Sequence, residues 1–448
     1  MYRLASDRIK EWLESSNKAL LVTGARQIGK TWLIRDEINK SEYDIFEINF
    51  INQPELIDYF NVEISATDFL VRLKMILPAS YQEKKTVIFF DEIQKCPEIV
   101  TKIKFLVDDG SFLYVLSGSL LGVELKNITS APVGYMTTIR MYPMDFQEFM
   151  IAYGVSNATL DMLKEKYEKL EPVDEYIHNK LMDLFYVYLI VGGMPEAVQT
   201  YIDTKDIRKV SAIHKDIIEF YKLDFTQYET ADKKLKLKSI YELIPAELNK
   251  QNKKFIFTHL NKELKFDRYE NSFLWLKDVG VALPVYSAEN HKVPLVASMS
   301  SNVFRLFDSD TGLLTSCYPD SVKMELIKHD GSINNGALFE NAVIQQLVAN
   351  NLTPYFYKKV KVGEVDAMVE LNGNVQLIEV KSGANYKAHK ALNNLMDIEE
   401  YDFDKAIVLS SANVEVEANI KYIPVYMTYL IKAEELSSSV VDVDIKGL

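Results

Sequence analysis

The chain has 448 residues, of which 48% are hydrophobic and 26% are charged, and it carries a formal net charge of −13. This length predicts about three domains with buried cores, and the composition excludes a disordered or fibrous protein. The acidic balance argues against a protein that coats nucleic acid through bulk charge, because phosphate binding needs clustered Lys and Arg.

The sequence does not indicate secretion or membrane insertion. The N-terminal segment is charged and amphipathic, and the apolar run at 184–194 is too short to span a bilayer. Cys96 and Cys317 have neither the number of a disulfide framework nor the spacing of a zinc site. We therefore expect a cytoplasmic protein with no membrane partner.

An apolar strand near the N-terminus runs into a glycine-rich loop and then a helix, in the segment ALLVTGARQIGKTWLIRDEI. This is the G-x-x-x-x-G-K-T pattern in its strand-loop-helix setting. Its glycines let successive N–H groups face phosphates, Lys30 adds a positive charge there, and the Thr31 hydroxyl can bind Mg²⁺. The candidate ATP-binding residues are Gly24, Ala25, Arg26, Gln27, Ile28, Gly29, Lys30, Thr31 and Trp32.

Acidic and polar side chains end the next two apolar runs, TVIFFDEIQK and FLYVLSGS. A carboxylate at the carboxyl end of a parallel strand lies where open α/β sheets bind ligands. We expect Asp91 to hold Mg²⁺ and Glu92 to orient and deprotonate the attacking water. Ser117 and Ser119 either sense the γ-phosphate between these motifs or simply form a turn.

These motifs carry a family resemblance. The segments LLVTGARQIGKT, VIFFDEIQK, VLSGSLLG and MYPMDFQEF resemble the AAA-type P-loop domain of a large bacterial and archaeal family of ATP-binding proteins. VGGMPEAV at 191–198 and FRLFDSDTGLL at 304–314 resemble the region that accompanies that domain. The resemblance implies an ATPase domain at residues 1–150 that binds ATP and Mg²⁺.

The chain departs from the family at one place. Many relatives carry a Gly-Arg pair, a candidate arginine finger, where this sequence has Gly134-Tyr135. Either Arg140 substitutes for it or hydrolysis is slow, since an arginine finger supplies several orders of magnitude in rate. Arg140 can equally be a surface charge at a strand end.

The middle of the chain is expected to be helical. Apolar spacing predicts a helical connector or lid at 151–235. In 236–325, three helices followed by β-like VALPVYS and KVPLVAS suggest a winged helix, whose third helix, 267–280, could enter a DNA major groove. The alternative, which we favour, is that this helix packs internally through Trp275 and Leu276.

Residues 326–448 follow the order helix, three strands, helix, two strands, which resembles the PD-(D/E)XK nuclease-like fold. Asp366 on the second strand and Glu379 and Lys381 on the third match its active-site pattern, and Glu340 lies on the opening helix. Glu379 and Lys381 are two residues apart, so they share one face of a strand, and an Asn-Gly turn folds Asp366 back towards them. Glu340, Asp366 and Glu379 are the predicted metal ligands, with Lys381 positioning a water.

The sequence therefore predicts an α/β protein with a parallel P-loop sheet, a helical and winged-helix-like middle, and a C-terminal restriction-endonuclease-like domain. The expected function is a Mg²⁺-dependent ATPase coupled to a nuclease-like domain that acts on DNA. The alternative is an ATP-dependent signalling or scaffold switch with an inert nuclease-like fold and a protein partner. Whether the chain forms a homo-oligomer stays open.

Overall fold

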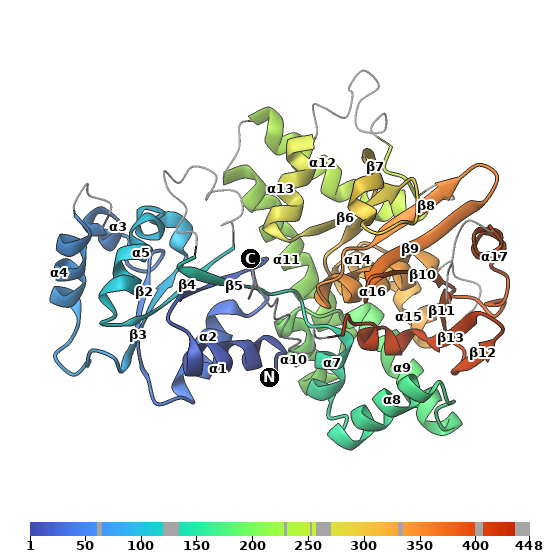
Figure 1. Cartoon of the computed structure of the whole chain (residues 1–448), viewed down its shortest axis with the longest axis horizontal. Helices are drawn as coiled ribbons and strands as arrows, with labels where there is room; N and C mark the ends of the chain where they lie inside the picture. Colours follow the sequence, from blue (N-terminus) through green and yellow to red (C-terminus); the bar gives the residue numbers. More distant parts are fainter. Residues whose placement is uncertain are drawn as a thin grey trace, which may run out of the picture.

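The computed structural model describes residues 1–60, 65–119, 134–227, 231–250, 253–256, 270–329, 335–398 and 406–434. These residues form two sheets, a smaller one near the N-terminus and a larger one near the C-terminus, with helices between them (Figure 1). None of the described helices is both long and apolar enough to cross a membrane.

The N-terminal sheet has five parallel strands in the order β2-β3-β4-β1-β5. The strands are β1 (Ala19–Thr23), β2 (Asp44–Asn49), β3 (Thr86–Asp91), β4 (Leu113–Gly118) and β5 (Met136–Arg140). All six residues of β3 are buried, as expected for a strand covered on both faces. This order places β4, with Ser117, between the strand that precedes the P-loop and the strand that ends at Asp91.

Helices cover both faces of this sheet. They are α1 (Ala5–Ser15), α2 (Lys30–Asn39), α3 (Glu55–Phe60), α4 (Ala66–Ile76) and α5 (Glu98–Asp109). Alternate residues of β3 point to opposite faces, so Val87 and Phe89 join one apolar cluster while Ile88 and Phe90 join another.

The middle of the chain is largely helical, as its apolar spacing predicts. Its helices are α7 (Phe146–Tyr153), α8 (Asn157–Lys169), α9 (Glu175–Val191), α10 (Pro195–Thr204), α11 (Ile207–Gln227), α12 (Ala231–Leu248), α13 (Glu270–Val279), α14 (Thr311–Ser316) and α15 (Asp320–Ile327). The apolar cluster that includes Val87 and Phe89 continues through α9 and α11 into the second sheet. A continuous core thus connects the P-loop sheet with the rest of the chain.

The second sheet has eight strands in the order β12-β13-β11-β10-β9-β8-β6-β7. They are β6 (Ala282–Ala288), β7 (Met299–Asp308), β8 (Tyr355–Lys359), β9 (Gly363–Leu371), β10 (Asn374–Val380), β11 (Ala406–Ser410), β12 (Glu415–Glu417) and β13 (Ile420–Pro424). The helices α16 (Gly336–Ala349) and α17 (Lys390–Met396) accompany it, and a 3₁₀ helix follows at Val425–Leu430. The last predicted strand, at 423–429, therefore begins and ends earlier than expected.

The hairpin predicted for the winged helix belongs to this second sheet. β6 pairs with β8 in parallel, through Tyr286 with Tyr355 and Ser287 with Phe356, so the sheet crosses the predicted boundary between residues 325 and 326. The second strand of the hairpin is β7 and not 292–298, where Leu295–Ser298 forms a 3₁₀ helix.

The described residues do not show a winged helix. The helix expected at 255–264 lies outside them except for residues 255–256, as does the start of the helix expected at 267–280. The described part of the latter, α13, buries Trp275 and Leu276, and Trp275 packs edge-on against Phe225 of α11. The internal packing of this helix through Trp275 and Leu276, which we favoured, is observed.

The β9–β10 hairpin has the predicted Asn-Gly turn. Leu371 pairs with Asn374, and the two residues between them, Asn372 and Gly373, have φ of +50° and +82°. Two successive positive φ angles match the right-handed twist of a two-residue hairpin, and Asn and Gly tolerate them best. Ala367 pairs with Ile378, so the turn brings Asp366 next to Glu379.

Candidate functional site

The P-loop connects the end of β1 to the start of α2. Gly24 and Gly29 have φ of +137° and +87°, a region that favours glycine. A Cβ on Gly24 would lie 2.3 Å from the Met141 carbonyl oxygen and 2.6 Å from Cδ1 of Ile28. The loop therefore requires glycine at position 24 for space as well as for its backbone angle.

Lys30 lies under this loop at the first position of α2. Its Nζ donates to the carbonyl oxygens of Gly24 at 2.9 Å and Ala25 at 2.7 Å. Burial lowers the pKa of Lys30 to about 8, although nearby Glu92 and Asp91 act in the opposite direction. A buried ammonium held by neutral carbonyls is well placed to bind an anion at the loop.

Asp91 is the point where the other predicted nucleotide-site residues meet. The Thr31 hydroxyl is 3.1 Å from Oδ2 of Asp91, and the Ser117 hydroxyl donates to Oδ1. Asn49 Nδ2, at the end of β2, also donates to Oδ2, at 2.9 Å. Side chains from three other segments, α2, β2 and β4, thus converge on the carboxylate of Asp91, a residue that is 3% exposed.

This donor set fits Mg²⁺ bound together with a nucleotide. Thr31 and Asp91 supply hydroxyl and carboxylate oxygens, which are the ligands that Mg²⁺ prefers. Within the described residues, no group of three His, Cys, Asp or Glu side chains could hold a metal ion. Mg²⁺ at a nucleotide normally needs only one or two protein ligands, because phosphates and water supply the others.

Glu92 follows Asp91 in a left-handed conformation, with φ of +56°. Its Oε2 accepts a hydrogen bond from Nε2 of Gln94 at 2.5 Å. Glu92 directly follows Asp91 in the chain, and its charge acts to raise the pKa of Lys30.

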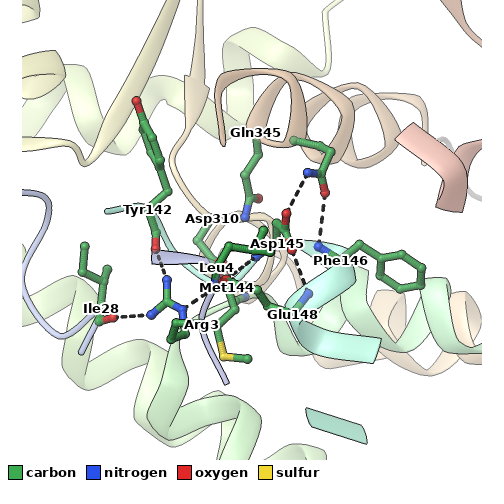
Figure 2. Close-up of polar contacts among 12 residues, drawn as sticks. Arg3, Leu4, Ile28, Tyr142, Met144, Asp145, Phe146, Glu148, Asp310 and Gln345 are labelled. Atoms are coloured by element: carbon green, nitrogen blue, oxygen red, sulfur yellow. Dashed lines mark hydrogen bonds and ion pairs between the residues drawn. The ribbon is translucent and has the colours of Figure 1, made fainter. Parts of the chain in front are cut away.

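Side chains from outside the sheet hold the P-loop. Arg3 donates to the carbonyl oxygens of Ile28 and Tyr142, each at 2.6 Å, and forms an ion pair with Glu148 at 3.1 Å (Figure 2). Arg26 bonds to Asp224 of α11 at 2.5 Å and to Ser119 at 3.2 Å.

Two other candidate residues, Trp32 and Arg140, are not among the residues that contact Asp91. Trp32 is half-exposed on α2. Arg140 donates to the Lys277 carbonyl at 2.7 Å, and its guanidinium lies over the Tyr142 ring, so it is tied to α13. These contacts favour a packing role for Arg140 over that of an arginine finger.

The segments 191–198 and 304–314, which resemble the region that accompanies the P-loop domain in the family, meet through buried hydrogen bonds. Gly193 N donates to the Asp310 carboxylate at 2.5 Å, and its carbonyl accepts from Met144 N at 2.7 Å. A Cβ on Gly193 would lie 2.0 Å from the Met144 carbonyl oxygen. Next to these contacts, Asp145 accepts a hydrogen bond from Gln346 of α16 at 3.0 Å. These motif residues therefore join the P-loop domain to the second sheet.

The four predicted C-terminal site residues lie in one neighbourhood. Lys381 Nζ is 2.8 Å from Oε1 of Glu379, and Asp366 Oδ2 accepts from Val380 N at 3.0 Å. Burial raises the pKa of Glu379 to about 8, with Asp366 adding to the effect. Burial and Asp366 likewise raise the pKa of Glu340 to about 7.

Arg305 of β7, which was not among the predicted site residues, lies among these carboxylates. Its Nη1 is 3.6 Å from Oε2 of Glu340 and 3.6 Å from Oδ1 of Asp366, and its Nη2 pairs with Glu364. The side chain is 1% exposed and lies over the Phe356 ring. Lys253 also pairs with Glu340.

The predicted metal ligands are thus paired with cationic side chains. In the described part of the chain, Glu340, Asp366 and Glu379 do not form a group that could hold a metal ion. Arg305 and Lys253 instead supply positive charge beside these carboxylates. One buried oxygen of Glu340 and one of Glu379 still have no hydrogen-bond donor among the described residues.

Several residues of these sites carried no sequence signal. Asp224 and Arg3 are far from the P-loop motif in the chain. Asn49 had a weak signal, since a polar residue ends an apolar strand next to the strand of Asp91. Arg305 lies in a segment that resembles the family, but only the pairing of β6 with β8 brings β7 to the carboxylates.

Three family models match the chain. Residues 16–150 match an AAA domain, residues 182–322 match a domain of unknown function (DUF8612), and residues 335–428 match another domain of unknown function (DUF4143). The N-terminal region is therefore an AAA-type P-loop ATPase domain. No curated protein matches the chain.

The chain is also similar to solved structures at low sequence identity. A Walker-type ATPase of Pyrococcus abyssi has 14% identity and a TM-score of 0.38, and the match covers 70% of this chain and 94% of that chain. Drosophila ORC bound to DNA has 12% identity and a TM-score of 0.28, with 68% and 91% covered. A RuvB variant of Thermotoga maritima has 14% identity and a TM-score of 0.28, with 65% and 89% covered.

Proposed function

We propose that this protein binds and hydrolyses ATP with Mg²⁺ and that nucleotide state sets the arrangement of its C-terminal sheet. The observation that carries this proposal is the 3.1 Å contact between Thr31 and Asp91, with Ser117 on the strand between them. These residues come from three separate motifs of an AAA-type domain.

The roles of the residues follow from their positions. Backbone N–H groups of the P-loop and Lys30 would bind the phosphates, replacing the loop carbonyls that now accept from Lys30. Mg²⁺, held by Thr31 and Asp91, would neutralise charge on the phosphates. Glu92 would orient the attacking water and accept its proton, and Gln94 would hold Glu92 in place.

Direct contacts provide a route from the nucleotide site to the second sheet. Arg3 joins the Ile28 carbonyl to Glu148, and Glu148 forms a capping box with Asp145 at the start of α7. Asp145 in turn accepts from Gln346 of α16. A change at the P-loop can therefore reach α16, which also carries Glu340, through buried polar contacts.

The experiment is steady-state ATP hydrolysis by the full chain with Mg²⁺. Glu92→Gln should lower turnover by about a hundredfold or more while ATP still binds, because a positioned base contributes that much. Lys30→Ala should abolish binding. Glu171→Gln, which makes the same chemical change at an exposed carboxylate paired with Lys166, is the matched control and should behave as wild type. Equal turnover in Glu92→Gln and the control would refute the assigned base.

A metal-dependent nuclease that acts on DNA is the second candidate. It is favoured by the proximity of Asp366, Glu379 and Lys381 at one end of the β9–β10 hairpin. It is disfavoured by Arg305, whose charge already neutralises part of this cluster. Supercoiled and single-stranded DNA, incubated with Mn²⁺ and ATP, should stay intact under the switch account. Cleavage that is lost in Asp366→Ala would establish the nuclease.

A further inference from the structure

Two residues of α11 contact Arg26 of the P-loop, one through the Arg26 side chain and the other through the Arg26 backbone. Nη1 of Arg26 is 2.5 Å from Oδ1 of Asp224, and the Tyr221 hydroxyl donates to the Arg26 carbonyl oxygen at 3.1 Å. Tyr221 and Asp224 are three residues apart and so lie on the same side of the helix. Nε of Arg26 also donates to Ser119, just after β4.

The carboxylate of Asp224 interacts electrostatically with Arg26 and Glu92 of the proposed nucleotide site. The residue is 5% exposed, and burial raises its pKa, while Arg26 acts in the opposite direction and Glu92 adds to the increase. Arg26 also contributes to lowering the pKa of Lys30. Arg26, Lys30, Glu92 and Asp224 are therefore close enough to influence one another around the space where the phosphates would bind.

We propose that Arg26 senses the terminal phosphate of ATP, exchanging its ion pair with Asp224 for a contact with the γ-phosphate. This inference rests on the proposed binding of ATP at the P-loop. Arg26 is part of the loop itself, and 28% of its side chain is exposed, so the guanidinium can reorient without opening the core. Arg26 would thereby supply the arginine at the γ-phosphate, a role for which Arg140 is poorly placed because it donates to the Lys277 carbonyl.

The exchange gives α11 a way to distinguish ATP from ADP. Only ATP brings a γ-phosphate, whose charge and three oxygens compete with one carboxylate for the guanidinium. Once Arg26 leaves, Asp224 is a buried carboxylate beside Glu92 without its partner, which weakens the hold of α11 on the P-loop. Because α11 packs against α14, directly after β7, the change reaches the second sheet.

The test is the ratio of ATP affinity to ADP affinity, measured with fluorescent nucleotides on the full chain with Mg²⁺. Arg26→Ala should lower the ratio by about tenfold, the value of a charge-assisted hydrogen bond. Asp224→Asn should raise the ratio by roughly threefold, because Arg26 then has a weaker competing partner. The double variant, Arg26→Ala with Asp224→Asn, should have the same affinity ratio as Arg26→Ala alone, because Asp224 affects the ratio through Arg26.

Two controls separate sensing from structural support. Asp206→Asn alters an exposed Arg–Asp pair, with Arg208, at the start of the same helix and should leave the ratio unchanged. Arg26→Lys keeps the charge and should restore part of the ratio. Equal changes in ATP and ADP affinity in both Asp224→Asn and Arg26→Ala would overturn the inference while leaving ATP binding intact. Absence of nucleotide binding by the wild type would instead overturn the proposed function.

Discussion

Replacing Arg305 with methionine should destabilise the protein strongly. At 3.6 Å and an effective dielectric constant of about 20, the guanidinium attracts Glu340 and Asp366 by about 4 to 5 kcal/mol each. The desolvation cost of burying the guanidinium offsets several kcal/mol of this attraction. Because Arg305→Met leaves buried carboxylates without their cation, we expect a net loss of about 3 to 5 kcal/mol in the free energy of unfolding.

The assay is urea denaturation followed by circular dichroism at pH 5.5 and pH 8.5. The pKa of Glu340 is raised to about 7, so this carboxyl is protonated at the lower pH and needs no cation there. The loss caused by Arg305→Met should therefore be smaller at pH 5.5 than at pH 8.5. Arg305→Lys keeps the charge but loses the planar guanidinium with its several N–H donors. Its free energy of unfolding should therefore lie between those of the methionine variant and wild type.

Arg208→Met is the matched control, since Arg208 pairs with Asp206 at the surface with a side chain that is 91% exposed. An exposed pair of this kind contributes about 1 kcal/mol or less. The reasoning would be refuted if Arg305→Met cost no more than this control at pH 8.5.

Three further predictions concern other positions. The pKa of Glu379 is raised from 4.5 to about 8, so its contribution to stability is full below pH 4.5 and is lost as pH rises through 8. Between these two pKa values the free energy of unfolding falls by about 1.4 kcal/mol per pH unit. Glu379→Gln should therefore flatten the decline of the thermal midpoint between pH 5.5 and 8.5. Gly24→Ala should weaken ATP binding and lower the melting temperature, because its Cβ would collide with the Met141 carbonyl. Gly373→Ala meets open space but has a φ of +82°, so it should cost about 1 kcal/mol of stability and leave ATP affinity unchanged, as denaturation and nucleotide titration would show.

Local motifs were sufficient to predict which side chains meet at one edge of the first sheet. The P-loop follows β1, Asp91 ends β3 and Ser117 lies near the end of β4, and parallel strands bring their carboxyl ends to one edge of the sheet. The Asn-Gly turn likewise fixed the register that places Asp366 beside Glu379. In these cases, a few neighbouring residues determine the geometry.

Long-range partners were not predictable in the same way. Arg26 and Asp224 are 198 residues apart, and no local pattern links them. Arg305 reaches the C-terminal carboxylates only because the β6–β7 hairpin pairs with β8, whereas the sequence suggested a separate winged helix. Strand pairing across a predicted domain boundary depends on the packing of the whole chain.

Binding of ATP tests the central claim most directly. Equilibrium dialysis with labelled ATP should be carried out on wild type and Lys30→Ala, each with Mg²⁺ or with EDTA. We expect wild type to bind ATP less tightly in EDTA than with Mg²⁺, and Lys30→Ala to show no binding, because Lys30 is the buried cation of the P-loop. Equal binding by both proteins, or no binding by wild type, would contradict the central claim.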